Sequence, residues 1–419
     1  MRTFIPIASL LLLTGYLSAQ LLNSPFQVNY PIAKTTSSLS SDYFCNSNAI
    51  SASFVNAFYQ GQFINTGLIN KVSGNLAAEN RMGAEFNAAA FYSYQPDSLS
   101  KFSKFGFFFS IQDRNHADIN FPKDLFNLLF YGNKSFEGQT AYLNNFNLHI
   151  LQYQQFQVGI TCKIGHSGIS YGIGLSALNG QQYQNITASK AELFTSTGGQ
   201  YIDLNSNISY QQSDISRSNL GSNSGAGFGM DAYLVLPIFI RQNRSEKFTV
   251  ELRDFGMIAW NKSSRTATAD SAYHYDGVAV NNILDLNNSA FGKANSDSIL
   301  KKAIKFNSGK ITSPLPTVIH INSLSTFGKW QLSKGLRYMF NANYRLNAYL
   351  TANYYLTKKL MLSLGASYGG YSLFNVNTGI AVDFGKGCIL RLYSNNIEGF
   401  ILPQIALGQS ASISLMKKF

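Results

Sequence analysis

The sequence predicts an all-β fold: a transmembrane antiparallel β-barrel of about fourteen strands, with sixteen as the alternative. The last eleven residues alternate between apolar and polar side chains. Charged residues make up only 13% of the 419 residues, whereas Phe (32), Tyr (24) and Gly (34) are abundant. Beyond the N-terminal region, no stretch approaches the roughly 18 consecutive apolar residues that a membrane helix requires.

The C-terminal strand is the clearest single element. Three serines alternate with Ala411, Ile413 and Leu415, and the chain ends on Phe419. Roughly 9–11 residues suffice for a tilted strand to cross a bilayer. A half-apolar strand ending on an aromatic residue resembles the outer-membrane barrels of Gram-negative bacteria. That resemblance implies that Phe419 is an assembly signal read by the barrel assembly machinery.

The N-terminus predicts secretion. Arg2 precedes a largely apolar stretch of ten residues, 4–13, and small residues follow at Ser18 and Ala19. This pattern is typical of a cleavable signal peptide, which we assign to residues 1–19. Residues 20–48 are polar and irregular, and residues 49–419 form the predicted barrel. Together these features predict an integral protein of the outer membrane of a Gram-negative bacterium.

The charge and the cysteines exclude several functional classes. The formal net charge is +12, but the basic residues are dispersed without long runs. Outer-membrane lipid is therefore the expected partner, and nucleic acid is not. Cys45, Cys162 and Cys388 allow one disulfide at most, and Cys162 reads as a small hydrophobic residue on a strand face.

Counting strands backward from Phe419 gives the expected topology. Both termini of such a barrel lie in the periplasm, where the turns are short. The breaks in the alternation expected on that side are 95–102, 240–246, 328–334, 357–359 and 383–387. The weakest strand pair, 184–195 and 199–212, has no lipid-facing side. We interpret it as an extracellular hairpin, which leaves fourteen strands.

Two segments predict helices instead of strands. Residues 121–132 have Pro122 at a first helical position, an acidic residue in the first turn and a stop at Gly132. Residues 296–305 predict a short amphipathic helix. Both fall in long outer excursions, 114–144 and 262–314. Either helix could fold into the barrel mouth as a plug or simply cap a loop, and the sequence does not decide between these.

Several segments resemble a family of Bacteroidota outer-membrane barrels of unknown function, akin to FadL-type transporters and to PorV- and PorP-type barrels. The resemblance covers nearly all of the mature chain, and the segments that match are residues 113–118, 124–133, 251–261, 316–322 and 390–396. FadL-type kinship would imply fourteen strands and a lumen plug, for which residues 20–48 are the candidate. No residue matches a fatty-acid site.

The resemblance suggests two functions. The first is passive transport of small or hydrophobic solutes in a FadL-like manner. The alternative is a non-conducting scaffold or anchor for secreted or surface proteins, as in PorV-like components. An open conduit or an apolar pocket beneath a strand gap would favour transport, whereas a packed lumen would favour the scaffold.

A polar cluster is predicted at a strand end, in a loop. Asp113, Arg114, His116 and Asp118 could ligate a hard cation at the barrel mouth. However, their spacing matches no cation-loop motif, and Arg114 would compete for the carboxylates. We therefore favour a salt-bridged structural loop and predict no metal and no cofactor.

Asp231, Glu251 and Arg253 are the candidate lumen residues, because their strand neighbours are apolar. Charges in a lumen can tune the selectivity of a pore. Alternatively they form internal ion pairs that brace a closed barrel, which we favour because buried charges are normally paired. Trp260 and Trp330 suit the aromatic girdles at the membrane surfaces.

Catalysis is not expected. The five histidines are His116, His149, His166, His274 and His320. A Ser/His pair needs a third group that orients the imidazole. His149 and His320 lie in predicted strands without a carboxylate at a facing spacing. The chain is therefore predicted not to be an enzyme.

Overall fold

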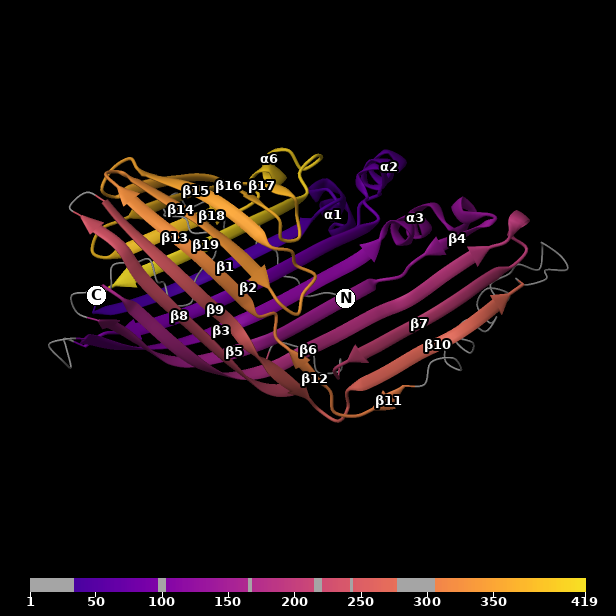
Figure 1. Ribbon diagram of the computed structural model, residues 1–419, viewed down its shortest axis with the longest axis horizontal. Helices are drawn as coiled ribbons and strands as arrows, with labels where there is room; N and C mark the ends of the chain where they lie inside the picture. The colour runs from indigo at the N-terminus through magenta and orange to yellow at the C-terminus, as the bar shows by residue number, and fades with distance from the viewer. Residues whose placement is uncertain (1–33, 97–102, 165–167, 215–220, 242–243, 277–305) are drawn as a thin grey trace.

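A closed antiparallel barrel of fourteen strands forms the body of the protein, so the predicted fold class and strand number are confirmed. The computed structural model describes residues 34–96, 103–164, 168–214, 221–241, 244–276 and 306–419. The first strand pairs with the last and closes the barrel. In order around the barrel (Figure 1), the strands are β1 (Thr35–Ser47), β2 (Glu79–Tyr94), β3 (Ser103–Pro122), β5 (Phe146–Ile164), β6 (Ser170–Thr195), β8 (Gly225–Arg241), β9 (Arg244–Trp260), β13 (Val318–Phe327), β14 (Trp330–Met339), β15 (Asn347–Tyr355), β16 (Leu360–Tyr368), β17 (Phe374–Asp383), β18 (Cys388–Ser394) and β19 (Gly408–Lys418).

The two faces of each barrel strand differ in polarity, because successive side chains of a strand point to opposite faces. In β15, Thr351 and Asn353 are buried on the inner face, whereas Leu350 is exposed on the outer face. In β19, Ile413 and Leu415 are likewise exposed outward. The outer face is therefore an apolar surface suited to lipid, and the inner face is polar.

The short turns gather at one end of the barrel, which we call the terminal end. There the backbone amide of Phe419 donates a hydrogen bond to the carbonyl of Thr35, and that of Lys418 donates to Gly387. The adjoining ends of β2 and β3 and of β8 and β9 lie at this end, as do the turns between β13 and β14, β15 and β16, and β17 and β18. The backward count therefore placed these breaks together correctly. The turn predicted over 328–334 is shorter, because β14 already begins at Trp330.

The prediction of a plug over residues 20–48 is wrong for Thr35–Ser47. These residues form β1, which is paired along its length with β2 and β19. The alternation of β1 is hard to recognise in the sequence, because serines and threonines occupy both of its faces. The predicted signal peptide 1–19 and residues 20–33 lie outside the described residues.

Helices cover the opposite end, which we call the loop end. The helices there are α1 (Ala52–Tyr59), α2 (Thr66–Asn75), α3 (Lys123–Tyr131), η2 (Asn133–Phe136), η3 (Thr197–Gly199) and α6 (Glu398–Ile401). α3 confirms the helix predicted over 121–132, and it stops at Gly132, which has a φ of 76°. Phe54, Val72 and Phe126 pack α1, α2 and α3 together. The helix predicted at 296–305 lies outside the described residues.

No α-helix in the described part of the chain is both long enough and apolar enough to cross a membrane.

A sheet extends from the barrel at the loop end (Figure 1, right). The C-terminal half of β6, from Gln184 onward, leaves the barrel and pairs with β7 (Ile202–Gln212), which in turn pairs with β10 (Arg265–Tyr275). We call this the β6–β7–β10 extension. It confirms that the weak pair 184–212 lies outside the barrel. The short strands of the loop end are β4 (Gln139–Tyr142), β11 (Asn307–Ser308) and β12 (Thr312–Pro314).

The assignment of Trp260 to an aromatic girdle is wrong. Its side chain is 1% exposed, its ring stacks on Tyr183 at 5.6 Å, and its Nε1 donates to Ser313 Oγ at 2.9 Å. The ring is buried by contacts with residues distant in the sequence, and its N–H group is hydrogen-bonded there, as is usual for a buried tryptophan. Trp330, in contrast, is 45% exposed at the terminal end and lies against Tyr354.

Candidate functional site: the polar network of the barrel lumen

The lumen is packed with polar side chains at the level of the described strands. Gln155 and Gln157 of β5 and Asn377 of β17 are fully buried on inward-facing positions. In a water-filled channel such side chains would be exposed to water. The three candidate lumen residues share this environment: Asp231, Glu251 and Arg253 are 0%, 3% and 4% exposed.

Asp231 lies in a β-bulge of β8, where the register against β9 shifts. Its carboxylate accepts a hydrogen bond from Gln157 Nε2 at 2.7 Å and another from the backbone amide of Asp254 at 2.6 Å. Asp254 itself has a φ of 56° and lies 3.5 Å from Arg114 Nη2. These four residues, Asp231, Gln157, Asp254 and Arg114, form what we call the Asp254 network. It joins β3, β5, β8 and β9 across the lumen.

Glu251 and His320 face each other across the β9–β13 ladder. His320 Nδ1 lies 3.8 Å from Glu251 Oε2, and its Nε2 lies 2.7 Å from the hydroxyl of Tyr349. The expectation that no carboxylate faces His320 is therefore wrong. The sequence could not show this pairing, because the two strands are separated by the long excursion that contains β10, β11 and β12.

A second network lies nearer the loop end. Glu85 on β2 stands opposite His116 on β3, and Asp118 stands opposite His149 on β5. His116 Nδ1 lies 3.0 Å from Glu85 Oε1, and its Nε2 lies 2.6 Å from Asp118 Oδ2. Asn343, in the turn between β14 and β15, donates through both its backbone and side-chain nitrogens to Asp118 Oδ1. We call these five residues, Glu85, His116, Asp118, His149 and Asn343, the histidine network.

The predicted loop cluster lies in a strand, not in a loop, and its residues are divided between the two faces of that strand. All four residues belong to β3, which continues to Pro122, so the excursion predicted from 114 starts later. Arg114, His116 and Asp118 share the inner face, whereas Asp113 has the opposite parity and hydrogen-bonds Asn115 Nδ2 at 2.9 Å. Arg114 pairs with Asp254 and leaves the carboxylate of Asp118 to the histidines.

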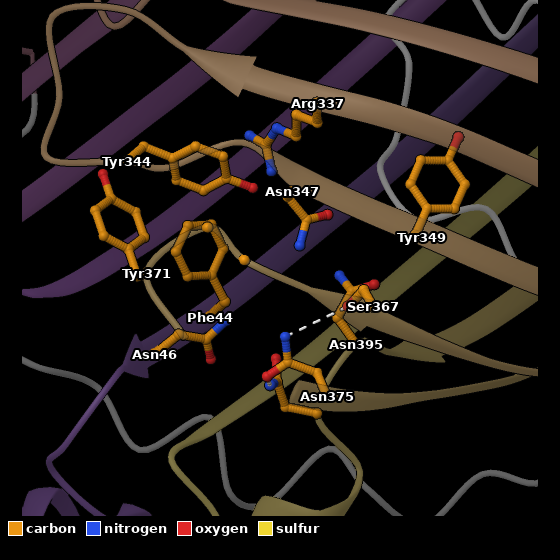
Figure 2. A pocket seen from close by; sticks show the side chains of 13 residues that line it. Phe44, Asn46, Arg337, Tyr344, Asn347, Tyr349, Ser367, Tyr371, Asn375 and Asn395 are labelled. Atoms are coloured by element: carbon orange, nitrogen blue, oxygen red, sulfur yellow. Dashed lines mark hydrogen bonds between the residues drawn. The ribbon is translucent and has the colours of Figure 1, made fainter. Parts of the chain in front are cut away.

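Two pockets open between the networks and the β14–β19 side of the barrel. One is lined by residues of the histidine and Asp254 networks together with Asp42, Arg253 and Arg337. Figure 2 shows the other, where Arg337, Tyr344 and Tyr371 approach a group of asparagines that includes Asn347 and Asn375. Each has a volume of about 40 Å³. At roughly 10–15 Å³ per water, each holds about three water molecules.

The turns after β14 and β16 contribute to this closure from the loop end. Tyr344 and Tyr371 pack edge to face at 5.0 Å, and Phe44 of β1 lies 6.1 Å from the Tyr371 ring. The guanidinium of Arg81 donates to the carbonyls of Gly370 and Ser372 and holds the second turn in place. The barrel is therefore closed here by its own turns.

A third histidine cluster lies outside the barrel, on the β6–β7–β10 extension. His274 Nδ1 lies 2.5 Å from Asp203 Oδ1 and its Nε2 lies 2.7 Å from Asp276 Oδ1. The hydrogen bonds to Asp203 and then to Asp276 raise the pKa of His274. All three side chains are well exposed, so this cluster senses the bulk pH directly.

Sequence analysis missed four lumen residues: His149, Asp254, Asn343 and Arg337. For His149 and Arg337, the alternation along their strands could have shown that both side chains point into the lumen. Asp254 follows a bulge that breaks the alternation, and Asn343 lies in a turn that folds inward, so no local pattern marks either. His166 lies outside the described residues.

Comparisons with known proteins bear mainly on the fold. A family model described as a family of unknown function (DUF5723) matches residues 19–389. No curated protein sequence matches the chain. Among solved structures, the Pseudomonas putida toluene transporter TodX is 11% identical, with a TM-score of 0.47, and the match covers 95% of this chain and 93% of TodX. A Pseudomonas aeruginosa FadL homologue is 10% identical, with a TM-score of 0.39, over 92% of this chain and 90% of its own.

Proposed function

Because the chain belongs to a family of unknown function (DUF5723), we propose from its geometry that it is an integral outer-membrane barrel of a Gram-negative bacterium. In this proposal it acts as a non-conducting scaffold that presents its loop end to a surface or secreted protein partner. The observation that carries the proposal is the packed lumen, in which inward-facing polar side chains are buried and mutually hydrogen-bonded.

The loop end supplies the surface that a scaffold needs. It bears α1, α2, α3 and the β6–β7–β10 extension, which together project well beyond the barrel (Figure 1). Large apolar side chains are exposed there, including Phe58, Phe63 and Leu129. Exposed apolar groups away from the lipid-facing belt are typical of protein contact surfaces.

Passive transport of small or hydrophobic solutes is the second candidate. The polar inner face would suit a solute path if the turns after β14 and β16 moved aside. Each of the two described pockets has a volume of about 40 Å³, and charged or amide groups line them together with aromatic and apolar side chains. A pocket of this size is far smaller than the roughly 300–1,000 Å³ of an ordinary ligand site. We therefore place transport behind the scaffold.

One experiment separates the two functions. The purified protein is reconstituted into liposomes, and the permeability to sugars and to a small aromatic solute is measured against protein-free liposomes. We expect no increase for either solute. Increased permeability to either would overturn the scaffold proposal and favour transport.

A crosslinking experiment tests the scaffold directly. A photoreactive amino acid replaces Phe63 at the loop end in cells that make the protein naturally. The matched control carries it at Leu364, which is exposed on the outer face of β16. A protein crosslink is expected at the first position and not at the second; crosslinks at neither position would count against a partner at the loop end.

A further inference from the structure

His116, Asp118 and His149 bring three metal-ligand atoms together inside the lumen. His116 Nε2, Asp118 Oδ2 and His149 Nδ1 lie within 4.8 Å of one another, and all three residues are buried. The arrangement follows from the ladder between β3 and β5, in which Asp118 pairs with His149 and His116 lies two residues away on the same face. Two imidazoles and one carboxylate are a common ligand set for divalent transition metals.

The two carboxylate contacts of His116 point to a positive charge at this position. A neutral imidazole has one N–H donor and one acceptor nitrogen. His116 nevertheless contacts a carboxylate through each nitrogen, Glu85 through Nδ1 and Asp118 through Nε2. The second contact therefore requires either an extra proton on the ring or a positive ion between Nε2 and the carboxylate.

His149 provides a second and independent observation. Its side chain is buried, and its Nδ1 has no hydrogen-bond partner within the described part of the chain. The atom is directed at Asp118 Oδ2 from 3.7 Å, too far for a hydrogen bond. An extra proton on His116 would explain the first contact and would still leave this buried nitrogen unpaired. A shared metal ion accounts for both.

The surrounding groups have the positions expected around a metal site. Glu85 accepts from His116 Nδ1, which fixes the tautomer that offers Nε2 to a metal. Asn343 donates to Asp118 Oδ1, so that Oδ2, which the Tyr371 hydroxyl contacts at 3.4 Å, faces the two histidines. Asn147 Oδ1 accepts from the side chain of Asn343 at 2.8 Å and holds that amide in place.

We propose that His116 Nε2, Asp118 Oδ2 and His149 Nδ1 bind one divalent transition metal ion of the zinc type. Ligand atoms about 2.0–2.2 Å from such an ion lie roughly 3.3–3.5 Å apart in a tetrahedral site. Asp118 Oδ2 would move away from His116 and toward His149 by under about 1 Å. The bound ion joins β3 to β5 and, through Asn343, to the turn between β14 and β15. It therefore reinforces the closed lumen.

The test uses the full-length protein without a polyhistidine tag, folded into detergent with Zn²⁺ or Co²⁺ and then desalted. We expect one tightly held metal ion per chain and, with Co²⁺, the visible absorption of a nitrogen- and oxygen-ligated ion. His149→Gln and Asp118→Asn should abolish that absorption. Glu85→Gln should keep the ligands and weaken affinity roughly 10–100-fold, as expected when an outer carboxylate is lost.

Two histidine variants serve as matched controls. His320→Gln removes another inward-facing histidine, partly buried, that also faces a glutamate, and it should leave one bound ion. His274→Ala removes the exposed cluster on the extension and should do the same. Wild-type protein without a stoichiometric ion would overturn the proposal and identify His116 as a doubly protonated brace. A His149→Gln variant that binds the metal ion as tightly as the wild type would also overturn it. If the ligand variants do not fold, Glu85→Gln is the deciding variant, and a metal affinity equal to that of the wild type would overturn the proposal.

Discussion

At the scale of single residues, charged side chains that are largely shielded from solvent join the strands across the lumen. Arg114 and Asp254 are 14% and 8% exposed and lie in the middle of a network that reaches four strands. Removing one member of such a pair leaves the other buried and uncompensated, which is far more costly than losing an ion pair at the surface. We therefore infer that these side chains stabilise the barrel and do not line an open pore.

Replacing Arg114 by methionine should therefore destabilise the protein strongly. Methionine keeps much of the side-chain volume but removes the positive charge beside Asp254. We expect a loss of about 3–5 kcal/mol in the free energy of unfolding, measured by urea titration in lipid vesicles. The control is Lys190→Met, which breaks the exposed pair with Glu192 and should cost less than about 1 kcal/mol. Equal effects of the two changes would refute the bracing role.

His274 gives the extension a pH dependence. Its pKa is raised above the ordinary value of 6.5 by Asp203 and Asp276, so the folded state holds the proton more tightly than the unfolded chain. The stabilisation is complete below about pH 6.5 and is lost as the pH rises through the folded-state pKa. NMR titration of the imidazole should give a midpoint above 6.5, and Asp203→Asn should lower it. A midpoint unaffected by that substitution would contradict the assignment.

At the scale of elements, the turn between β16 and β17 fits against β2 only because residue 83 is a glycine. A Cβ at Gly83 would lie 2.2 Å from Cε2 of the Tyr371 ring. That ring also contacts Phe44 and Tyr344, and its hydroxyl lies 3.4 Å from Asp118 Oδ2. The approach of this turn to β2 therefore links the closure of the lumen to the histidine network.

Gly83→Ala should displace that turn and cost about 1–3 kcal/mol in the free energy of unfolding, the usual price of overpacking. The matched control is Gly74→Ala in α2, where a Cβ meets nothing within 4 Å and should stabilise the helix by roughly 0.5–1 kcal/mol. Adding Tyr371→Ala to Gly83→Ala should cost less than the sum of the single changes, because the clash is then gone. Strict additivity would show that the two residues do not compete for space.

The elements also show which features of the fold a sequence can reveal. The period-two alternation is local, so β15, β19 and the first half of β3 were predictable from it. The strand number was predicted correctly although β1 was not recognised as a strand. Asp118 pairs with His149 in the β3–β5 ladder, and α3, η2 and β4 lie between these two strands in the sequence. No local sequence pattern therefore specifies the register of this ladder. The bulge at Asp231 and the inward turn carrying Asn343 break the periodicity on which prediction relies.

At the scale of the whole molecule, closure of the lumen has two separate causes. Hydrogen-bonded charges cross-link the strands inside the lumen, and an aromatic group made of Phe44, Tyr344 and Tyr371 closes the side toward the loop end. Substitutions in the charge networks should destabilise the barrel, because these networks join its strands. The aromatic group lies beside a pocket of about 40 Å³ and makes none of the ion pairs that join the strands, so we expect that it can be removed without unfolding the barrel.

The triple change Phe44→Ala, Tyr344→Ala and Tyr371→Ala should therefore open a path for ions. Three lost rings would join the pocket of Figure 2 to the solvent at the loop end. In planar bilayers we expect no conductance steps for the wild type and discrete steps for the triple variant. The control removes the same number of aromatic rings from the loop end, at Phe58, Tyr59 and Phe63, all strongly exposed, and should stay silent. Conductance by the wild type or by this control would show that the aromatic group is not what closes the barrel.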